Sequence, residues 1–143
     1  MHTYIDVAYG VHSDLRSQTG GCISFGTGSI INKALKQKIN TKSSTEGELV
    51  GASDYLLHVI WVHYFMNVQG YPIKTSFLEQ DNKSTIKLIK HGHALTGQKS
   101  KHINIRYFWI TNHLKRDGFT LRHCNTESIL ADFLSKPQQG SLF

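Results

Sequence analysis

The sequence predicts one α/β domain in which helices flank a mixed five-stranded sheet, with elements in the order β-β-β-α-β-α-α-β-α. Two observations favour this class. The second and third strand-like segments flank a Gly-Thr-Gly turn at residues 26–28, which indicates a hairpin. Helical and strand-like segments then alternate, which is typical of parallel crossovers. A chain of 143 residues is long enough for one core of this kind but short for two.

The expected strands are short segments rich in β-branched and aromatic residues, and turn residues bound them. They cover residues 3–9, 19–25, 29–35, 75–80 and 119–124. The first strand holds tyrosine, isoleucine and valine around Asp6, and the turn residues Asp117 and Gly118 precede the last. These segments supply the five strands of the sheet.

The expected helices have apolar residues three and four positions apart. They cover residues 45–68, 82–90, 103–116 and 127–135. Gly70 and Pro72 end the longest helix, and Pro137 ends the last. We expect large apolar side chains of the two longer helices to lie in the core; these are Trp61, Tyr64, Phe65, Ile105, Phe108, Trp109 and Leu114.

Composition narrows the classes of function. Lys and Arg total 16 against 10 Asp and Glu, which gives a net charge of +6 and a pI near 9.4. A basic domain is drawn to polyanions such as nucleic acid. No apolar run of about eighteen residues occurs, so we expect no membrane span, and the opening residues do not resemble a signal peptide. Two cysteines, Cys22 and Cys124, do not indicate a disulfide scaffold.

Three aspartates stand where an ordinary solvated carboxylate is unusual. Asp6 lies inside an apolar strand, Asp81 closes a strand, and Asp132 has apolar neighbours on both sides. Simpler interpretations exist for each of them. Asp6 could face water on an edge strand, Asp81 could cap the next helix, and Asp132 could be an exposed helix acid. As a set, however, they are candidates for a shared site at the carboxyl ends of the strands.

Two glutamates, Glu46 and Glu48, open the long helix. Residues 43–46 and 45–48 both match a capping box, so one glutamate can cap the helix while the other points toward the sheet. Glu48 shares the apolar face of the helix more than Glu46 does. We therefore expect Glu48 to be the inward carboxylate.

Asp6, Glu48, Asp81 and Asp132 come from two strands and two helices and could converge at one end of the sheet. Carboxylate oxygens suit Mg²⁺, and also Mn²⁺. Two such ions about 4 Å apart can activate a water molecule and stabilise the leaving oxygen of a phosphodiester. The pattern indicates a metal-dependent hydrolase whose basic surface holds a polyanion.

Five motifs follow one another along nearly the whole chain. They are Tyr-Ile-Asp at 4–6, Lys-Ser-Ser-Thr-Glu-Gly-Glu-Leu-Val at 42–50, Gln-Asp-Asn-Lys-Ser-Thr-Ile at 80–86, Lys-His-Ile-Asn-Ile-Arg-Tyr-Phe at 101–108 and Ala-Asp-Phe-Leu-Ser-Lys-Pro at 131–137. In order and spacing they resemble the signatures of ribonuclease H from copia-type (Pseudoviridae) LTR retrotransposons. The hairpin segment at residues 16–21 is similar to that family as well.

The resemblance implies the ribonuclease H-like fold and an endonuclease that hydrolyses the RNA strand of RNA–DNA hybrids during reverse transcription. It implies a catalytic site in which Asp6, Glu48, Asp81 and Asp132 hold two Mg²⁺ ions, or Mn²⁺ in their place. Cellular relatives carry a histidine just before the last helix. Residues 125–128 contain none here, and His123, which is close by, belongs to the expected last strand.

The resemblance also implies a setting. Residues 1–137 would form the ribonuclease H domain, and residues 138–143 a C-terminal tail. The domain would belong to a Pol polyprotein with an upstream reverse transcriptase, and it would work inside the cell in a cytoplasmic virus-like particle.

A cationic segment enters the third helix. Its members are Lys99, Lys101, His102 and Arg106. These side chains could grip the phosphates of the substrate, or they could form an ordinary solvated face, and the sequence does not decide between the two.

Two other functions stay open. The chain could be a catalytically inactive ribonuclease H-like module that binds nucleic acid or spaces other Pol domains. It could also be another nuclease or a transposase-like integrase of the same fold, although those typically use three acids.

Overall fold

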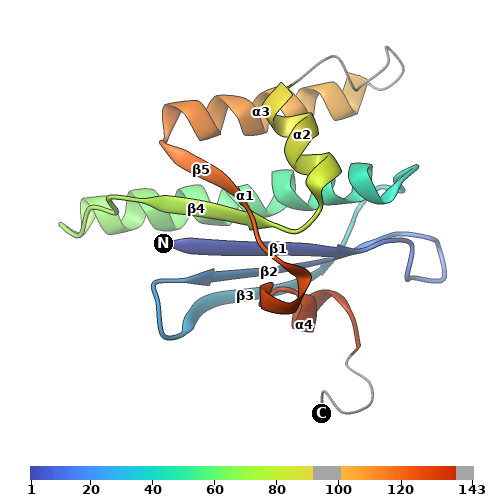
Figure 1. Cartoon of the computed structure of the whole chain (residues 1–143), viewed down its shortest axis with the longest axis horizontal. Helices are drawn as coiled ribbons and strands as arrows, with labels where there is room; N and C mark the ends of the chain where they lie inside the picture. Colours follow the sequence, from blue (N-terminus) through green and yellow to red (C-terminus); the bar gives the residue numbers. More distant parts are fainter. Residues whose placement is uncertain (92–100, 138–143) are drawn as a thin grey trace.

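The computed structural model describes residues 1–91 and 101–137 and shows a mixed five-stranded sheet (Figure 1). The strands are β1 (His2–Ala8), β2 (Gln18–Ser24), β3 (Ser29–Lys36), β4 (Ser76–Gln80) and β5 (Phe119–His123), in the spatial order β3-β2-β1-β4-β5. Strand β2 pairs antiparallel with β1 and β3, whereas β4 runs parallel to β1 and β5. The predicted fold class and element order are confirmed, and the carboxyl ends of β1 and β4 lie at the same edge of the sheet.

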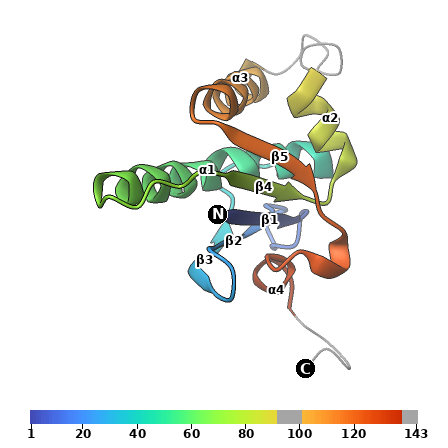
Figure 2. The same cartoon turned by 60° about the vertical axis from the view of Figure 1, so that its left-hand side comes forward.

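Within residues 1–91 and 101–137, four α-helices flank this sheet (Figure 2). They are α1 (Ser44–Val68), α2 (Lys83–His91), α3 (Lys101–Arg116) and α4 (Asp132–Ser135). Helix α1 packs on β1 and β2, α3 packs on α1 and β5, and α4 packs on β1, β2 and β3. None of the helices in the described part of the chain combines the length and the apolar character that crossing a membrane requires.

Two neighbouring glycines of β2 show that α1 and α4 lie on opposite faces of the sheet. A Cβ atom at Gly21 would overlap the ring of Tyr55 in α1. A Cβ atom at Gly20 would overlap the carbonyl oxygen of Ala131 and lie 2.8 Å from the backbone nitrogen of Ser135 in α4. Successive strand residues point to opposite faces, so the two missing side chains allow close approach of a helix on each side.

The core fills the space between the sheet and helices α1, α2 and α3. Its most buried apolar side chains include Ile5, Ile23, Leu49, Leu56, Leu78 and Ile110. Burial of each side chain of this size stabilises the fold by about 1.5–3 kcal/mol. The fully buried Tyr55 keeps its hydroxyl satisfied by donating a hydrogen bond of 3.2 Å to the carbonyl oxygen of Ile31.

The last helix is shorter than the sequence predicted. Residues 126–128 form a 3₁₀ turn, Ile129 has an extended backbone, and α4 begins only at Asp132. Ile129 and Ala131 are both buried. Residues two positions apart do not share one face of a helix, so the break lets both side chains reach the interior.

The prediction that the large apolar residues of α1 and α3 lie in the core is wrong for five of them. Trp61, Tyr64, Phe65, Ile105 and Phe108 are each at least 46 % exposed, whereas Trp109 and Leu114 are partly buried against the core. Helix α1 carries apolar residues on two faces, and only one face can lie on the sheet. On the outer face the rings of Trp61 and Phe65 stack with their centroids 5.1 Å apart.

Candidate metal centre

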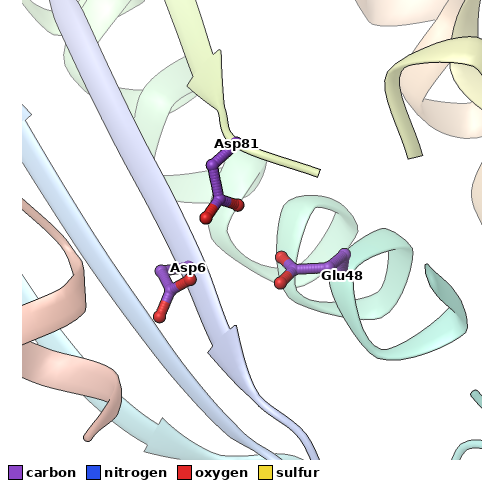
Figure 3. Close-up of side chains that lie close together, drawn as sticks. All are labelled: Asp6, Glu48 and Asp81. Atoms are coloured by element: carbon purple, nitrogen blue, oxygen red, sulfur yellow. The ribbon is translucent and has the colours of Figure 1, made fainter. Parts of the chain in front are cut away.

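Three of the predicted site residues meet at the edge of the sheet where β1 and β4 end. Asp6, Glu48 and Asp81 each offer a carboxylate oxygen, and these oxygens lie within 4.8 Å of one another. Figure 3 shows the three side chains close together, coming from β1, from α1 and from the chain just after β4. They are 42 and 33 residues apart in the sequence, so only the tertiary structure brings them together.

Asp6 is held on the face of the sheet that α4 covers. The side chain of its neighbour Val7 lies on the opposite face, against Gly47 and Gly51 of α1, so strand alternation places Asp6 on the face of α4. Glu48 meets Asp6 only at the edge of the sheet, where α1 begins. The side chain is buried at 2 % exposure. Its Oδ2 atom accepts a hydrogen bond from the hydroxyl of Ser135. A strand aspartate that the sequence could place at an exposed edge thus lies inside a sheet, under a helix.

Glu48 reaches the centre because the first turns of α1 lie very close to β1. Gly51 makes this approach possible, since a Cβ atom there would lie 2.6 Å from Cγ2 of Val7. Ser43 caps the helix by accepting a hydrogen bond of 3.2 Å from the backbone N–H of Glu46. The Glu46 carboxylate turns back and accepts from the backbone N–H of Lys42 at 2.8 Å. Glu46 therefore stabilises the start of the helix, and Glu48 is the buried, inward glutamate, as predicted.

The environment of Glu48 raises the pKa of its carboxyl group from the ordinary 4.5 to about 8. Burial is the largest cause, and the negative charges of Asp6 and Asp81 add to it. A hydrogen bond of 2.8 Å from Nε2 of the buried Gln80 acts in the opposite direction but does not compensate. Three carboxyl groups thus lie close together in a largely buried space, where a divalent cation would favour the charged form of Glu48.

Asp81 follows β4 directly and is free to face the centre because its neighbour caps the next helix. Oδ1 of Asn82 accepts a hydrogen bond of 3.0 Å from the backbone N–H of Thr85 in α2. The alternative in which Asp81 is the capping residue is therefore wrong. Oδ2 of Asp81 accepts a hydrogen bond of 3.0 Å from the hydroxyl of Thr126, which leaves the rest of the carboxylate available to a ligand.

Asp132 stands apart from the other three carboxylates. It is the first residue of α4, its side chain is 29 % exposed, and the three-carboxylate group does not include it. Its Oδ1 atom accepts a hydrogen bond from the ammonium group of Lys136, which also lies 3.3 Å from Oδ2 of Asp6. The structure thus links Asp132 to Asp6 through a lysine and leaves the four-carboxylate site a proposal.

The cationic segment that the sequence singled out is described only in part. Lys99 and the side chain of His102 lie outside the described residues. Lys101 is exposed at the start of α3. The guanidinium of Arg106 donates to Asp54 of α1, six residues after Glu48, which is about 9 Å along the helix. Arg106 therefore already has an acidic partner, and a role for this segment in phosphate binding stays a prediction.

In the described part of the chain, sequence reasoning missed four side chains that touch the candidate carboxylates: Gln80, Thr126, Ser135 and Lys136. Gln80, Ser135 and Lys136 do lie inside the quoted motifs, directly beside or near a candidate acid. Their place beside a candidate acid in a motif was the one feature of the sequence that could have indicated these residues. A hydroxyl or amide group forms no sequence pattern from which a distant hydrogen-bond partner could be predicted.

Solved structures with the same arrangement of elements decide the fold. Ribonuclease H1 from the halophilic archaeon Halobacterium salinarum superimposes with a TM-score of 0.65 over 94 % of this chain and 92 % of its own, at 14 % sequence identity. LC11-RNase H1, in a complex with an RNA/DNA hybrid, superimposes with a TM-score of 0.63 over 93 % of this chain and 91 % of its own, at 9 % identity. The chain has the ribonuclease H fold.

Sequence comparison finds similar proteins among the polyproteins of retrotransposons. No protein-family model matches the chain. The retrovirus-related Pol polyprotein of transposon TNT 1-94 from Nicotiana tabacum is 29 % identical over 85 % of the chain. That of transposon RE1 from Arabidopsis thaliana is 26 % identical over the whole chain. The chain spans 9 % and 10 % of the length of these two polyproteins. The resemblance of the motifs to retrotransposon ribonuclease H is thus confirmed.

Proposed function

We propose that this chain is a metal-dependent endonuclease that hydrolyses the RNA strand of RNA–DNA hybrids. The observation that carries the proposal is the convergence of Asp6, Glu48 and Asp81 within 4.8 Å, on a ribonuclease H fold. The relationship to LC11-RNase H1, whose complex contains an RNA/DNA hybrid, supports the choice of substrate. The basic character of the chain, with a net charge of +6, suits a polyanionic substrate.

The residues of the centre fit divalent cations of the Mg²⁺ type. All three groups are hard oxygen ligands. Burial close to Asp6 and Asp81 raises the pKa of Glu48, an effect that a bound cation would offset. Asp6, Glu48 and Asp81 would hold one ion, and Asp6 and Asp132 a second. When bound, such ions supply Lewis acidity that activates a water molecule and supports the leaving oxygen, leaving a 5′ phosphate and a 3′ hydroxyl.

The chain's own contribution is to hold these ligands in place. Gln80 and Thr126 orient Glu48 and Asp81 through hydrogen bonds, and Ser135 orients Asp6. Partners of this kind keep a ligand in one geometry before an ion arrives. The close packing of α1 and α4 on opposite faces of the sheet then keeps the ligands from separating.

The Pol polyprotein relatives suggest where the activity is used. We infer that the chain removes RNA from hybrids made by the reverse transcriptase of the same polyprotein, inside a virus-like particle in the cell. In this setting residues 1–137 form the nuclease unit and residues 138–143 the tail.

A cleavage assay tests the proposal. A hybrid with a labelled RNA strand is incubated with the chain and Mg²⁺, and the products are separated by length. We expect cleavage by the wild type and, for Asp81→Asn, a loss greater than the roughly 10- to 100-fold typical of removing a ligand's supporting partner. Asp14→Asn is the matched control, because Asp14 is an exposed acid bound to Lys36 and Arg16.

Two outcomes would contradict the nuclease function. Binding of the hybrid without cleavage in Mg²⁺ or Mn²⁺ would favour the inactive nucleic-acid-binding module. Cleavage of duplex DNA in preference to the hybrid would favour another nuclease of the same fold.

A further inference from the structure

Lys136 is a residue of the last motif to which the proposed function assigns no role. It follows α4 directly. Its ammonium group donates to Oδ1 of Asp132 and lies 3.3 Å from Oδ2 of Asp6. Within the described ranges, it is the one cation whose nitrogen lies within 4.0 Å of a candidate metal ligand. A positive charge of the chain itself thus bridges Asp6 and Asp132.

The centre is divided into two sides that differ in their partners. Glu48 and Asp81 are bound to neutral donors, Gln80 and Thr126. The opposite side consists of Asp6 and Asp132, and the ammonium group of Lys136 lies between their carboxylates. A cation held by Asp6, Glu48 and Asp81 shares only one of its ligands, Asp6, with Lys136. A cation held between Asp6 and Asp132 meets an ammonium group that contacts both of its ligands.

We propose that Lys136 is a built-in competitor for the second divalent ion: its ammonium group occupies the cation position between Asp6 and Asp132 and must leave before an ion binds there. This inference rests on the proposed function, since it assumes a metal centre. It predicts two unequal sites, a stronger one at Asp6, Glu48 and Asp81 and a weaker one at Asp6 and Asp132. Lys136 would thereby set the ion concentration at which the full centre assembles.

The structure lets the side chain leave without unfolding α4. The side chain of Lys136 is 43 % exposed, so its charged end can turn into water. The backbone N–H of Lys136 donates to the carbonyl oxygen of Asp132 and keeps the end of the helix closed. Ser135 holds Asp6 independently through its hydroxyl. Loss of the ammonium contact therefore does not remove the other contacts of α4.

Titration of the full chain with Mn²⁺ tests this inference without any measurement of cleavage. Free Mn²⁺ is measured by electron paramagnetic resonance and the heat of binding by calorimetry. The variants are Lys136→Met, which removes the charge, and Lys136→Arg, which keeps it. Lys115→Met, on the exposed surface of α3, is the matched control for a lost positive charge.

The expected result is a selective change at the weaker site. In Lys136→Met the second ion binds roughly fivefold or more tightly, because a competing ion pair of about 1 kcal/mol is gone. The affinity for the first ion rises by less, because Lys136 contacts only one of its three ligands. Lys136→Arg and Lys115→Met keep the weak second site. Circular dichroism checks that each variant is folded, and Lys136→Gln serves as a second neutral variant.

Other outcomes separate this inference from the proposed function. If the wild type and Lys136→Met bind the second ion with the same affinity, the inference is overturned, whereas the proposal of a metal centre is not. Weaker binding of the second ion in both neutral variants would also overturn it, since Lys136 would then only position Asp132. Absence of Mn²⁺ binding in all variants would overturn the metal centre, and the inference with it. If Lys115→Met binds the second ion as tightly as Lys136→Met does, the effect comes from the net charge of the chain, and Lys136 is not a specific competitor.

Discussion

Gly20 of β2 lies directly opposite Asp6 of β1 in the antiparallel register, and α4 packs where a side chain at Gly20 would lie. The two residues are therefore parts of one arrangement. Asp6 provides a carboxylate on this face of the sheet, and Gly20 makes room for the helix that carries Ser135 to it. The hydrogen bond that holds Asp6 therefore depends on the absence of a side chain at Gly20.

Replacement of Gly20 by alanine tests this relationship. The new Cβ atom would overlap the carbonyl oxygen of Ala131, and backbone atoms can yield only if α4 moves. We expect a loss of about 1–3 kcal/mol in the free energy of unfolding, together with reduced hybrid cleavage, as measured by urea denaturation and the cleavage assay. Gly28→Ala is the control, because no atom lies within 4 Å of its added Cβ. An unchanged stability of Gly20→Ala would show that α4 docks loosely.

Glu46 and Glu48 form a matched pair for the assignment of the helix ligand. Glu48→Gln should lower the rate of hybrid cleavage more than the roughly 10- to 100-fold expected for loss of a supporting partner. Glu46→Gln should keep the rate within a few-fold, because Glu46 only accepts a hydrogen bond from the Lys42 backbone. Glutamine can still accept this hydrogen bond, so the free energy of unfolding should fall by only about 0.3–1 kcal/mol, for the negative charge lost near the N-terminus of α1. The opposite pattern of rates would mean that the wrong glutamate has been assigned.

The raised pKa of Glu48 predicts how stability depends on pH when no metal is present. Between pH 4.5 and about 8 the folded chain retains a proton on Glu48 that the unfolded chain has released. Stability should therefore fall as the pH rises through this window, by up to about 1.4 kcal/mol per pH unit from this group. Urea denaturation in the presence of EDTA from pH 5 to 8 measures the slope.

Glu48→Gln is the control for this pH dependence, because it cannot titrate, and its slope should be flatter. Metal binding should show the related trend, since a ligand must lose its proton to bind. The apparent affinity for Mn²⁺ should rise with pH up to about 8. Equal slopes for the wild type and Glu48→Gln would exclude a strongly raised pKa at this carboxyl group.

Thr126 tests the support of Asp81 by a residue that sequence reasoning missed. Thr126→Val keeps the shape of the side chain and removes the hydroxyl that donates to Oδ2 of Asp81. We expect Mn²⁺ affinity to fall by about 10-fold, at the lower end of the effect of such partners. Thr120→Val, at an exposed position of β5, is the control and should bind Mn²⁺ like the wild type. If the two variants behave alike, Asp81 needs no support from Thr126.

The local sequence predicted the positions of most helices and strands correctly, but it predicted less well which face of each helix is buried. The break before Asp132 was missed because the pattern of residues 127–135 is compatible with a helix, and only the burial of both Ile129 and Ala131 requires the chain to interrupt it. Trp61 and Phe65 were expected in the core because their spacing is helical. That spacing gives the period of a helix but does not say which of two apolar faces the sheet will cover.

The sequence by itself determined the order of strands and helices, the inward choice of Glu48 over Glu46 and the resemblance to retrotransposon ribonuclease H. Turn residues, caps and periodicity act over a few neighbouring positions, so they can be read without the fold. Only the tertiary structure decided that Asp6, Glu48 and Asp81 meet and that Lys136 bridges Asp6 and Asp132. These outcomes depend on contacts between residues up to 130 positions apart, and such contacts are set by the packing of α1 and α4 on the sheet.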